Sequence, residues 1–197
     1  MAAAVSLGKW REWVSTVVPE IPGPNVLELG HGPGHLQDEL GCLGIKHVGI
    51  DESVQMGAFA RKRLKKSLCT ARLARAHAQS LPFPDGHFHQ VAATFPSEYI
   101  LDPKTLSEAY RVLLPGGKLV ILPAAWITGK GALERTAAWL FKVTEQAPTW
   151  DDDKLAPLSK TGFYLNLKKI VNPSWSLLIT IAEKPVTDQH LSLRESS

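Results

Sequence analysis

The sequence predicts an α/β fold with one doubly wound domain, in which helices cover both faces of a mostly parallel sheet. Three observations predict this fold. Apolar, strand-like runs alternate four times with helix-like stretches along the chain. The first run ends in a turn with glycine at positions 30, 32 and 34. Residues 162–170 and 174–183 read as two strands joined at Asn172-Pro173, which predicts an antiparallel hairpin.

Composition indicates a single globular domain. The chain has 197 residues, 44% of them hydrophobic, enough for one substantial core but not for a separate substrate domain. The formal net charge of +3 is too small to indicate a nucleic-acid partner, and the basic run 61–66 is expected to be a solvated helix face. Cys42 and Cys69 form no Cys-x-x-Cys motif, so neither a disulfide framework nor a zinc site is expected.

The hydropathy of the chain gives no sign of a membrane segment. No apolar run approaches the length of a span, and the apolar start of the chain is too short for a signal-peptide core. We therefore expect a soluble, cytoplasmic protein in a reducing compartment. The sequence leaves open both peripheral contact with lipid and the oligomeric state.

The first half of the chain starts with an expected amphipathic helix over residues 5–18. The helical spacing of Trp10, Trp13 and Val17 predicts it, and prolines at 19, 22 and 24 end it. The elements that follow are predicted from apolar runs, helical periodicity and glycine stops. They are a strand at 25–30, a helix at 34–43, a strand at 46–51, a helix at 53–66, a strand at 71–77 and a loop over 79–86.

The second half continues the alternation before the terminal hairpin. Its predicted elements are a strand at 89–95, a helix at 103–114, a turn at 115–117, a fifth strand reaching Leu122, an apolar segment at 123–127 and a helix at 131–146. The acidic run 151–153 is expected to cap or precede a further short helix.

Two carboxylates stand where open α/β sheets bind ligands. Glu28 lies near the end of the first predicted strand, and Asp51 ends the second, 21 residues beyond Gly30. A carboxylate at that second position can accept hydrogen bonds from the ribose hydroxyls of a nucleoside cofactor. The glycine turn permits positive φ and close approach of the backbone to a ligand. Its Gly-x-Gly-x-Gly spacing differs from the dinucleotide fingerprint, whose third glycine would stand at His35.

The segment 28–34, ELGHGPG, resembles the cofactor loop of class I S-adenosylmethionine (SAM)-dependent methyltransferases. Segments 80–88, SLPFPDGHF, and 106–121, LSEAYRVLLPGGKLVI, resemble the small-molecule branch related to ubiquinone and menaquinone C-methyltransferases, with a methyltransferase type 11 domain. The resemblance covers residues 25–184. It implies a Rossmann-like, mostly parallel seven-stranded sheet that ends in an antiparallel hairpin.

The resemblance also implies how the chain is divided. Residues 1–24 are expected to form an N-terminal helix and lead-in, and residues 25–184 the methyltransferase domain. The polar stretch 185–197 is expected to be a disordered tail.

SAM is the cofactor that the resemblance implies, with S-adenosyl-L-homocysteine (SAH) as its product and no metal. Each part of SAM is assigned to residues that match the family's motifs. They are Glu28, Gly30, His31, Gly32 and Gly34 at the methionine part, Asp51 and Glu52 at the ribose, Met56, Ala78 and Gln79 at the adenine, and Thr94, Phe95 and Pro96 at the methyl-transfer crevice.

Methyl transfer in this family implies in-line displacement at the methyl carbon, with the protein aligning a nucleophile. No dedicated catalytic residue is identified; His31, His35 and Tyr99 are candidates for a base. The acceptor is expected to be a small, largely apolar molecule rather than a nucleic acid. The aromatic residues expected around it are Trp10, Trp13, Tyr99, Trp126 and Trp139.

Two departures from the family leave alternatives open. His77 stands where many relatives carry an acidic residue before the adenine-contacting alanine, and His89 stands where many carry aspartate. A SAM-binding protein without catalysis is therefore one alternative, and an NAD-dependent oxidoreductase is a second, disfavoured by the glycine spacing. A metal site at His31 and His35 is not expected, because the intervening 32–34 stretch breaks the helix that such a pair needs.

Overall fold

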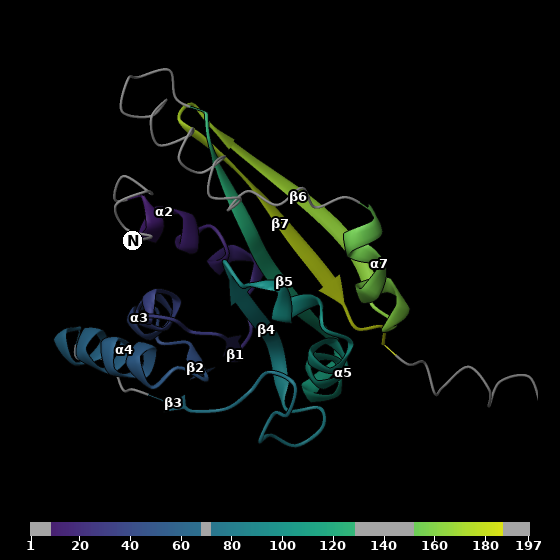
Figure 1. Cartoon of the computed structure of the whole chain (residues 1–197), viewed down its shortest axis with the longest axis horizontal. Coiled ribbons are helices and arrows are strands. Elements are labelled where there is room, and N and C mark those ends of the chain that lie inside the picture. Colours follow the sequence, from purple (N-terminus) through teal and green to yellow (C-terminus); the bar gives the residue numbers. More distant parts are fainter. Residues whose placement is uncertain (1–8, 68–71, 129–151, 187–197) are drawn as a thin grey trace, which may run out of the picture.

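One seven-stranded sheet forms the centre of the molecule, in the order β3-β2-β1-β4-β5-β7-β6 (Figure 1). This computed structural model describes residues 9–67, 72–128 and 152–186. The strands are β1 (Asn25–Leu29), β2 (Lys46–Ile50), β3 (Leu73–Ala74), β4 (Phe88–Thr94), β5 (Leu113–Ile127), β6 (Tyr164–Asn172) and β7 (Trp175–Glu183). The first five strands pair in parallel, whereas β7 is antiparallel to both β5 and β6. The predicted fold class and terminal hairpin are confirmed.

The direction in which strands are added reverses beside β1. From β1 the chain adds β2 and β3 on one side and then returns to place β4 on the other. Ligands of open α/β sheets bind at the carboxyl ends of the strands, where such a reversal leaves a crevice. The crevice of this chain is therefore expected between the ends of β1 and β4.

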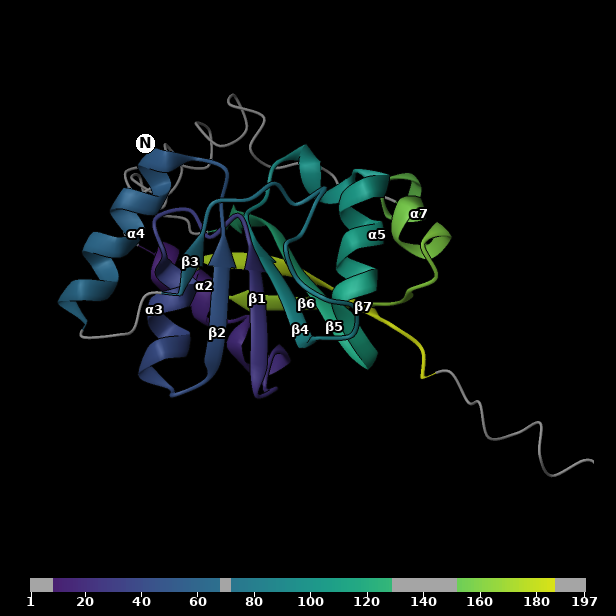
Figure 2. The same cartoon turned by 90° about the horizontal axis from the view of Figure 1, so that it is seen from below.

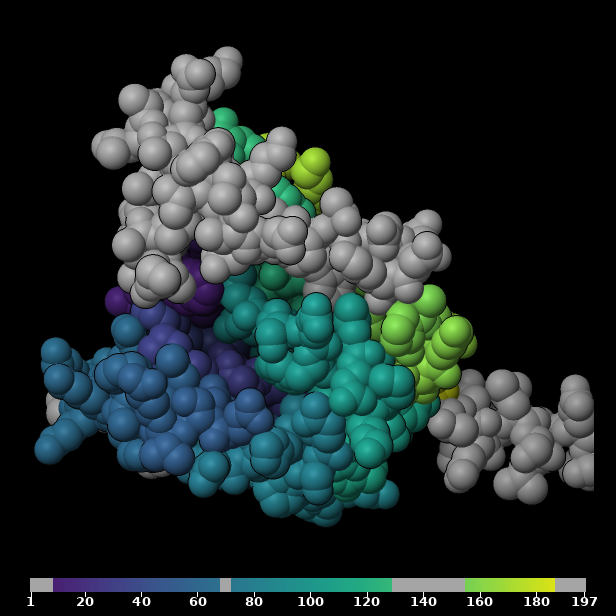
Figure 3. Space-filling model, in the orientation of Figure 1, coloured from purple at the N-terminus to yellow at the C-terminus, as the bar shows by residue number. Residues whose placement is uncertain are grey.

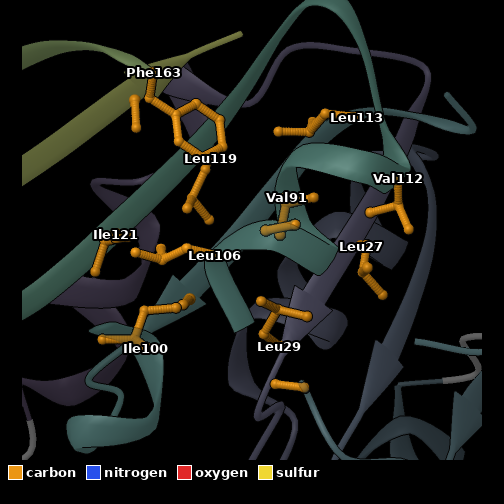
Figure 4. Close-up of a cluster of buried hydrophobic side chains, with 14 of the residues drawn as sticks. Leu27, Leu29, Val91, Ile100, Leu106, Val112, Leu113, Leu119, Ile121 and Phe163 are labelled. Atoms are coloured by element: carbon orange, nitrogen blue, oxygen red, sulfur yellow. The ribbon is translucent and has the colours of Figure 1, made fainter. Parts of the chain in front are cut away.

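Helices pack on both faces of the sheet (Figure 2). They are α2 (Trp10–Ser15), α3 (His35–Cys42), α4 (Val54–Lys66), α5 (Pro103–Val112) and α7 (Asp152–Lys160), with the short 3-10 helices η1 (Val18–Glu20) and η2 (Glu98–Leu101). Successive strand residues point to opposite faces. Leu27 and Leu29 accordingly join the core under α5 and α7 (Figure 4), while Val26 joins the core under α2 and α3.

The loop before β4 is fastened to α5 by one arginine. Arg111 donates hydrogen bonds to the carbonyls of Leu81 (3.1 Å) and Phe83 (2.8 Å) and to the carboxylates of Asp85 and Glu108. The backbone N–H of Leu81 in turn donates to Glu108 (2.7 Å). These bonds from Arg111 and Leu81 lower the pKa of Glu108. The segment of the strongest family resemblance thus has a structural task, which is to hold the loop on the helix.

The predicted N-terminal helix and third strand both run further toward the C-terminus than the observed elements, and residues 5–8 and 71 of these predictions lie outside the described residues. Within the described residues, α2 ends at Ser15 and the separate η1 follows, with Pro19 inside it. A proline lacks the N–H that would continue an α-helix. The third strand, predicted over 71–77, is paired only at Leu73 and Ala74, next to Gly49 and Ile50 of β2. Beyond these two residues the chain leaves the sheet edge.

The fifth strand is longer than predicted at both ends. The expected turn at 115–117 lies inside β5, where Gly116 has φ +77° and the pairing with β4 shifts register. The expected apolar segment 123–127 is also strand, because it pairs with β7 after a second register shift around Pro123. The predicted helix over 131–146 and the tail beyond 186 lie outside the described residues.

The basic run at residues 61–66 lies on the surface of α4, as expected from the sequence. Arg61, Lys62, Lys65 and Lys66 of α4 are exposed, so the basic run is a solvated helix face. No helix in the described ranges has both the length and the apolar character needed to cross a bilayer.

Candidate functional site

A pocket of about 410 Å³ opens at the carboxyl edge of the sheet, between the ends of β1, β2 and β4. This volume lies in the range of pockets that take small molecules and cofactors. Its lining residues are Gly30, Ile50, Asp51, Glu52, Ala76, His77, Ala78, Gln79, Phe95, Pro96, Ser97 and Tyr99. Figure 3 shows this region, where purple residues from the first part of the chain lie recessed between blue and teal ones.

The glycine turn after β1 reaches the pocket through Gly30. Gly30, Gly32 and Gly34 have φ values of +66°, +50° and +79°, a left-handed conformation that side chains disfavour. A Cβ at Gly30 would lie 2.4 Å from the Tyr99 hydroxyl, and one at Gly34 would lie 2.9 Å from the Cβ of Ala60. Two of the three glycines are therefore required by close packing as well as by conformation.

Asp51 ties the glycine turn to the start of α4. Its Oδ2 accepts the backbone N–H of Gly32 (2.9 Å), and its Oδ1 accepts that of Ser53 (2.8 Å). A carboxylate has about four acceptor sites, so both oxygens keep capacity for hydroxyls of a ligand. Asp51 lines the pocket, as the strand-end argument predicts.

Glu28 lies beneath the turn and does not line the pocket. Its side chain is fully buried on the face covered by α3, where Gln37 Nε2 donates to one carboxyl oxygen (2.9 Å) and Thr94 Oγ1 to the other (3.3 Å). Burial raises the pKa of Glu28 to about 8, and the nearby charge of Asp51 raises it further in the same direction. At neutral pH Glu28 is therefore mostly protonated, and it joins β1, α3 and β4 through hydrogen bonds.

A second wall of the pocket is aromatic and is formed by Phe95 and Tyr99. Phe95, directly after β4, has φ +50°, which makes it the one described non-glycine residue with positive φ. Its backbone N–H donates to the carbonyl of Leu122 (2.7 Å), and its ring lies 4.2 Å from that of Trp10 and 6.1 Å from that of Trp13. Strained backbone of this kind is concentrated at functional sites.

Tyr99 closes the same wall from η2. Its hydroxyl donates to the carbonyl of Leu29 (3.0 Å), the last residue of β1. Burial raises the pKa of Tyr99, and the charges of Glu28 and Asp51 raise it further. The phenol consequently stays protonated at neutral pH, which disfavours Tyr99 as a general base.

A polar rim borders the pocket between the ends of β2 and β3. His77 Nδ1 lies 2.9 Å from Glu52 Oε2, and both side chains are about 70% exposed. Arg75 donates to the backbone carbonyl of Glu52 (2.9 Å), and the Gln79 amide donates to Asp102 (3.2 Å), the N-cap of α5.

The structure brings eight of the predicted site residues together in the pocket. They are Gly30, Asp51, Glu52, Ala78, Gln79, Phe95, Pro96 and Tyr99. The others predicted at the cofactor do not line it: Glu28, His31, Gly32, Gly34, Met56 and Thr94. His31 is buried, and its Nδ1–H donates to the Gly32 carbonyl (2.7 Å).

His35 also lies away from the lining residues. Its Nε2 accepts a hydrogen bond from Arg63 (3.2 Å). Burial and the neighbouring Arg63 charge lower the pKa of His35 to about 4. The imidazole is therefore neutral and only weakly basic under ordinary conditions, which disfavours His35 as a base.

The predicted acceptor residues separate into different environments. Trp13 is fully buried in the core under α2, whereas the half-buried Trp10 packs on Phe95 at the pocket wall. Trp126 lies in the part of β5 that pairs with β7, and it does not line the pocket. Trp139 lies outside the described residues.

Sequence reasoning missed four lining residues, which are Ile50, Ala76, His77 and Ser97. Three of them, Ile50, His77 and Ser97, directly adjoin residues that were predicted. His77 was noticed only as a departure from the family. Its pairing with Glu52 depends on a contact across two strand ends, which no local pattern shows.

The comparisons with known proteins agree with this geometry. A family model described as a methyltransferase domain matches residues 27–121, a range that contains every residue lining the pocket. A demethylmenaquinone methyltransferase of Thermus thermophilus is 37% identical over 117 residues, which make up 58% of this chain and 53% of the relative. The matched region, residues 27–121, is a methyltransferase domain of the class I type. It spans about half the length of the curated relatives it matches.

Solved structures resemble this chain over most of its length. The YcgJ protein of Bacillus subtilis has a TM-score of 0.66 at 13% identity, over 88% of this chain and 98% of that one. Geranyl diphosphate C-methyltransferase of Streptomyces coelicolor, solved with Mg²⁺, geranyl diphosphate and SAH, has a TM-score of 0.64 at 13% identity, over 88% and 78%. At such identities the similarity concerns the fold alone.

Proposed function

We propose that this chain is a SAM-dependent methyltransferase that acts on a small, largely apolar acceptor. The observation that carries the proposal is the pocket at the reversal of strand order, bordered by the left-handed glycine turn and by the carboxylate of Asp51. The relationship to methyltransferases supports the reaction class, and one structural neighbour was solved with SAH.

The chemistry of the lining residues fits SAM. Asp51 and Glu52 offer acceptors for the two ribose hydroxyls, and Ile50, Ala76 and Ala78 offer apolar surface for a purine ring. The turn 30–34 offers a close backbone approach for the methionine part. We therefore propose that SAM binds with its nucleoside between the ends of β2 and β3 and its methyl group toward the end of β4.

SAM, when bound, supplies a methyl group made electrophilic by a sulfonium. The residues of this chain have the remaining tasks of binding, orienting and excluding water. Asp51 holds the turn in its binding conformation through Gly32. The aromatic pair Phe95 and Trp10 presents an apolar surface where the acceptor would approach. With the phenol of Tyr99 protonated and His35 outside the pocket, the geometry favours positioning over proton abstraction by a single side chain.

An apolar acceptor agrees with the aromatic wall and with the placement of the basic run. The exposed lysines of the 61–66 run lie on α4, whose residues do not line the pocket. A macromolecular acceptor would favour a basic rim instead. The curated relative is named for demethylmenaquinone, so quinol-like compounds are the first acceptors to test. A cytoplasmic location and peripheral lipid contact belong to the same proposal.

Two measurements test the proposal. Calorimetric titrations with SAM, SAH and NADH are expected to show binding of the first two and none of NADH. Transfer of a labelled methyl group from SAM is then measured with quinol-like, phenolic and lipid acceptors beside RNA, DNA and protein. Transfer to a small apolar acceptor supports the proposal. Binding without any transfer would favour a non-catalytic SAM-binding protein, and transfer confined to a macromolecule would refute the acceptor class.

A further inference from the structure

Positive charge is concentrated on α4 and on the segment that follows it. Residues 53–84 contain seven lysine or arginine residues and no aspartate or glutamate. Because the whole chain has a formal net charge of +3, the other residues together have one of −4. The helix α4 lies at the outer edge of the molecule, beside α3 (Figure 1 and Figure 2). The pocket does not account for this charge, since no residue of α4 lines it.

The two sides of α4 differ in chemistry. The side turned toward the molecule is small and apolar, and its buried residues are Gly57, Ala60 and Leu64. The outer side carries exposed residues at every fourth position, which places them in one stripe along the helix. They are Val54, Ala58, Lys62 and Lys66, with Phe59 and Lys65 beside them. We call these six residues the α4 face, which is apolar in the first half of the helix and basic in the second.

Two large apolar side chains of the α4 face are open to solvent. Val54 is 62% exposed and Phe59 is 48% exposed. Single exposed apolar residues are common on protein surfaces and need no explanation. Here two of them share one helix face with three lysines, which is the composition of a helix that lies in a membrane interface.

The lysines of the α4 face have no ion-pair partner within the part of the chain that the structure describes. Lys65 and Lys66 stand in the last turn, where positive charge complements the helix dipole. Lys62 lies before that turn, and its repulsion of the lysines three and four residues further on slightly destabilises the helix. An anionic partner outside the molecule would remove this cost.

We propose that the α4 face binds the surface of an anionic lipid bilayer. Val54 and Phe59 enter the headgroup region, and the three lysines contact lipid phosphates. The long lysine side chains can reach the phosphates while their methylene groups lie on apolar surface. A single-stranded nucleic acid fits this surface less well, because proteins hold such strands in a charged groove, whereas α4 presents the convex side of a helix.

Binding through the α4 face would place the pocket close to the bilayer. The helix begins at Val54, and Glu52, two residues earlier, lines the pocket. One end of the α4 face therefore adjoins the pocket rim. An apolar acceptor dissolved in the bilayer would have a short route to the pocket; this consequence rests on the proposed function, whereas binding of the bilayer itself requires neither SAM nor an acceptor.

Co-sedimentation of the full chain with lipid vesicles tests the inference. The vesicles contain phosphatidylcholine alone or phosphatidylcholine mixed with phosphatidylglycerol, which is anionic. Lys62→Gln combined with Lys66→Gln removes two charges from the α4 face. Lys104→Gln combined with Lys160→Gln is the matched control, which removes two exposed lysines from α5 and α7. Phe59→Ser removes the exposed ring, and circular dichroism verifies that each variant is folded.

The unaltered chain is expected to bind the vesicles with phosphatidylglycerol and not those of phosphatidylcholine alone. A lysine near an anionic surface contributes roughly fivefold in affinity, so the α4 double variant should bind roughly 25-fold more weakly and the control double variant nearly as well as the unaltered chain. Phe59→Ser should weaken binding by about fivefold.

Three outcomes would overturn the inference. They are an unaltered, folded chain that does not bind anionic vesicles, equal losses in the two double variants, and unchanged binding by Phe59→Ser. Tighter binding of a labelled single-stranded RNA than of the vesicles, lost in the α4 double variant, would assign the surface to nucleic acid instead. None of these outcomes bears on SAM binding or methyl transfer in solution, so the proposed function is tested separately.

Discussion

Replacing Glu28 by glutamine tests whether the buried carboxyl beneath the glycine turn is protonated in the folded protein. Glutamine has nearly the same shape, accepts from Gln37 through its carbonyl, and can donate toward Thr94. It differs in that it cannot lose a proton. The substitution should therefore leave the packing of the site unchanged and remove one titrating group from the core.

The sign and magnitude follow from the pKa of Glu28. Burial raises it from 4.5 to about 8, so the folded state holds a proton that the unfolded chain releases. The stability this provides is complete below pH 4.5 and is lost as the pH rises through 8. Each pH unit in that window corresponds to about 1.4 kcal/mol. From pH 5.5 to 7.5 the unaltered chain should lose on the order of 2 to 3 kcal/mol of unfolding free energy relative to Glu28→Gln.

Denaturant unfolding at pH 5.5, 6.5, 7.5 and 8.5 measures this difference directly. The other titrating groups are common to both proteins and cancel in the comparison. Glu98→Gln, at an exposed position of η2, is the matched control and should show a difference that does not vary with pH. A pH-independent difference for Glu28→Gln as well would refute the assignment of a protonated, buried Glu28.

Three further substitutions probe the site and its support. Asp51→Ala should weaken SAM binding by about 1 to 3 kcal/mol, because ribose hydroxyls lose a charged acceptor; unchanged affinity by calorimetry in a folded variant would remove Asp51 from the site. Tyr99→Phe should cost about 1 kcal/mol of unfolding free energy through the lost bond to Leu29 but leave methyl transfer measurable, and a complete loss of turnover with intact cofactor affinity would assign Tyr99 a chemical role. Arg111→Ala should lower the free energy of unfolding by about 1 to 2 kcal/mol, because the loop before β4 loses its bonds to the guanidinium. Arg11→Ala is the control: its 3.5 Å pair with Glu39 is more exposed, so the free energy of unfolding measured with denaturant should change little.

Helices and strands whose hydropathy pattern follows from the burial of their own side chains were predicted from the sequence. The strand at 25–30, the helix at 53–66 and the hairpin after residue 162 lie within one or two residues of the observed bounds. Hydropathy periodicity gave the wrong strand length where pairing with a strand distant in sequence decides that length. The strand predicted at 71–77 shortens to two residues at the sheet edge, and β5 lengthens through 123–127 because β7 pairs with it.

The candidate site shows the same division. The glycines and Asp51 are visible in sequence, because conformational freedom and a strand-end carboxylate are local properties. Their consequences in three dimensions are not local. Burial of Glu28 beneath the turn and the left-handed conformation of Phe95 both depend on neighbours far along the chain, from α3, β4 and α2.

The central claim is that SAM occupies the pocket at the ends of β1, β2 and β4. A crystal structure of the chain with SAH tests it most directly. Density for SAH is expected among the lining residues, with the ribose hydroxyls in hydrogen-bond contact with Asp51 and the sulfur toward Phe95. SAH bound elsewhere on the molecule, or a pocket that stays closed to it at saturating concentration, would contradict the claim.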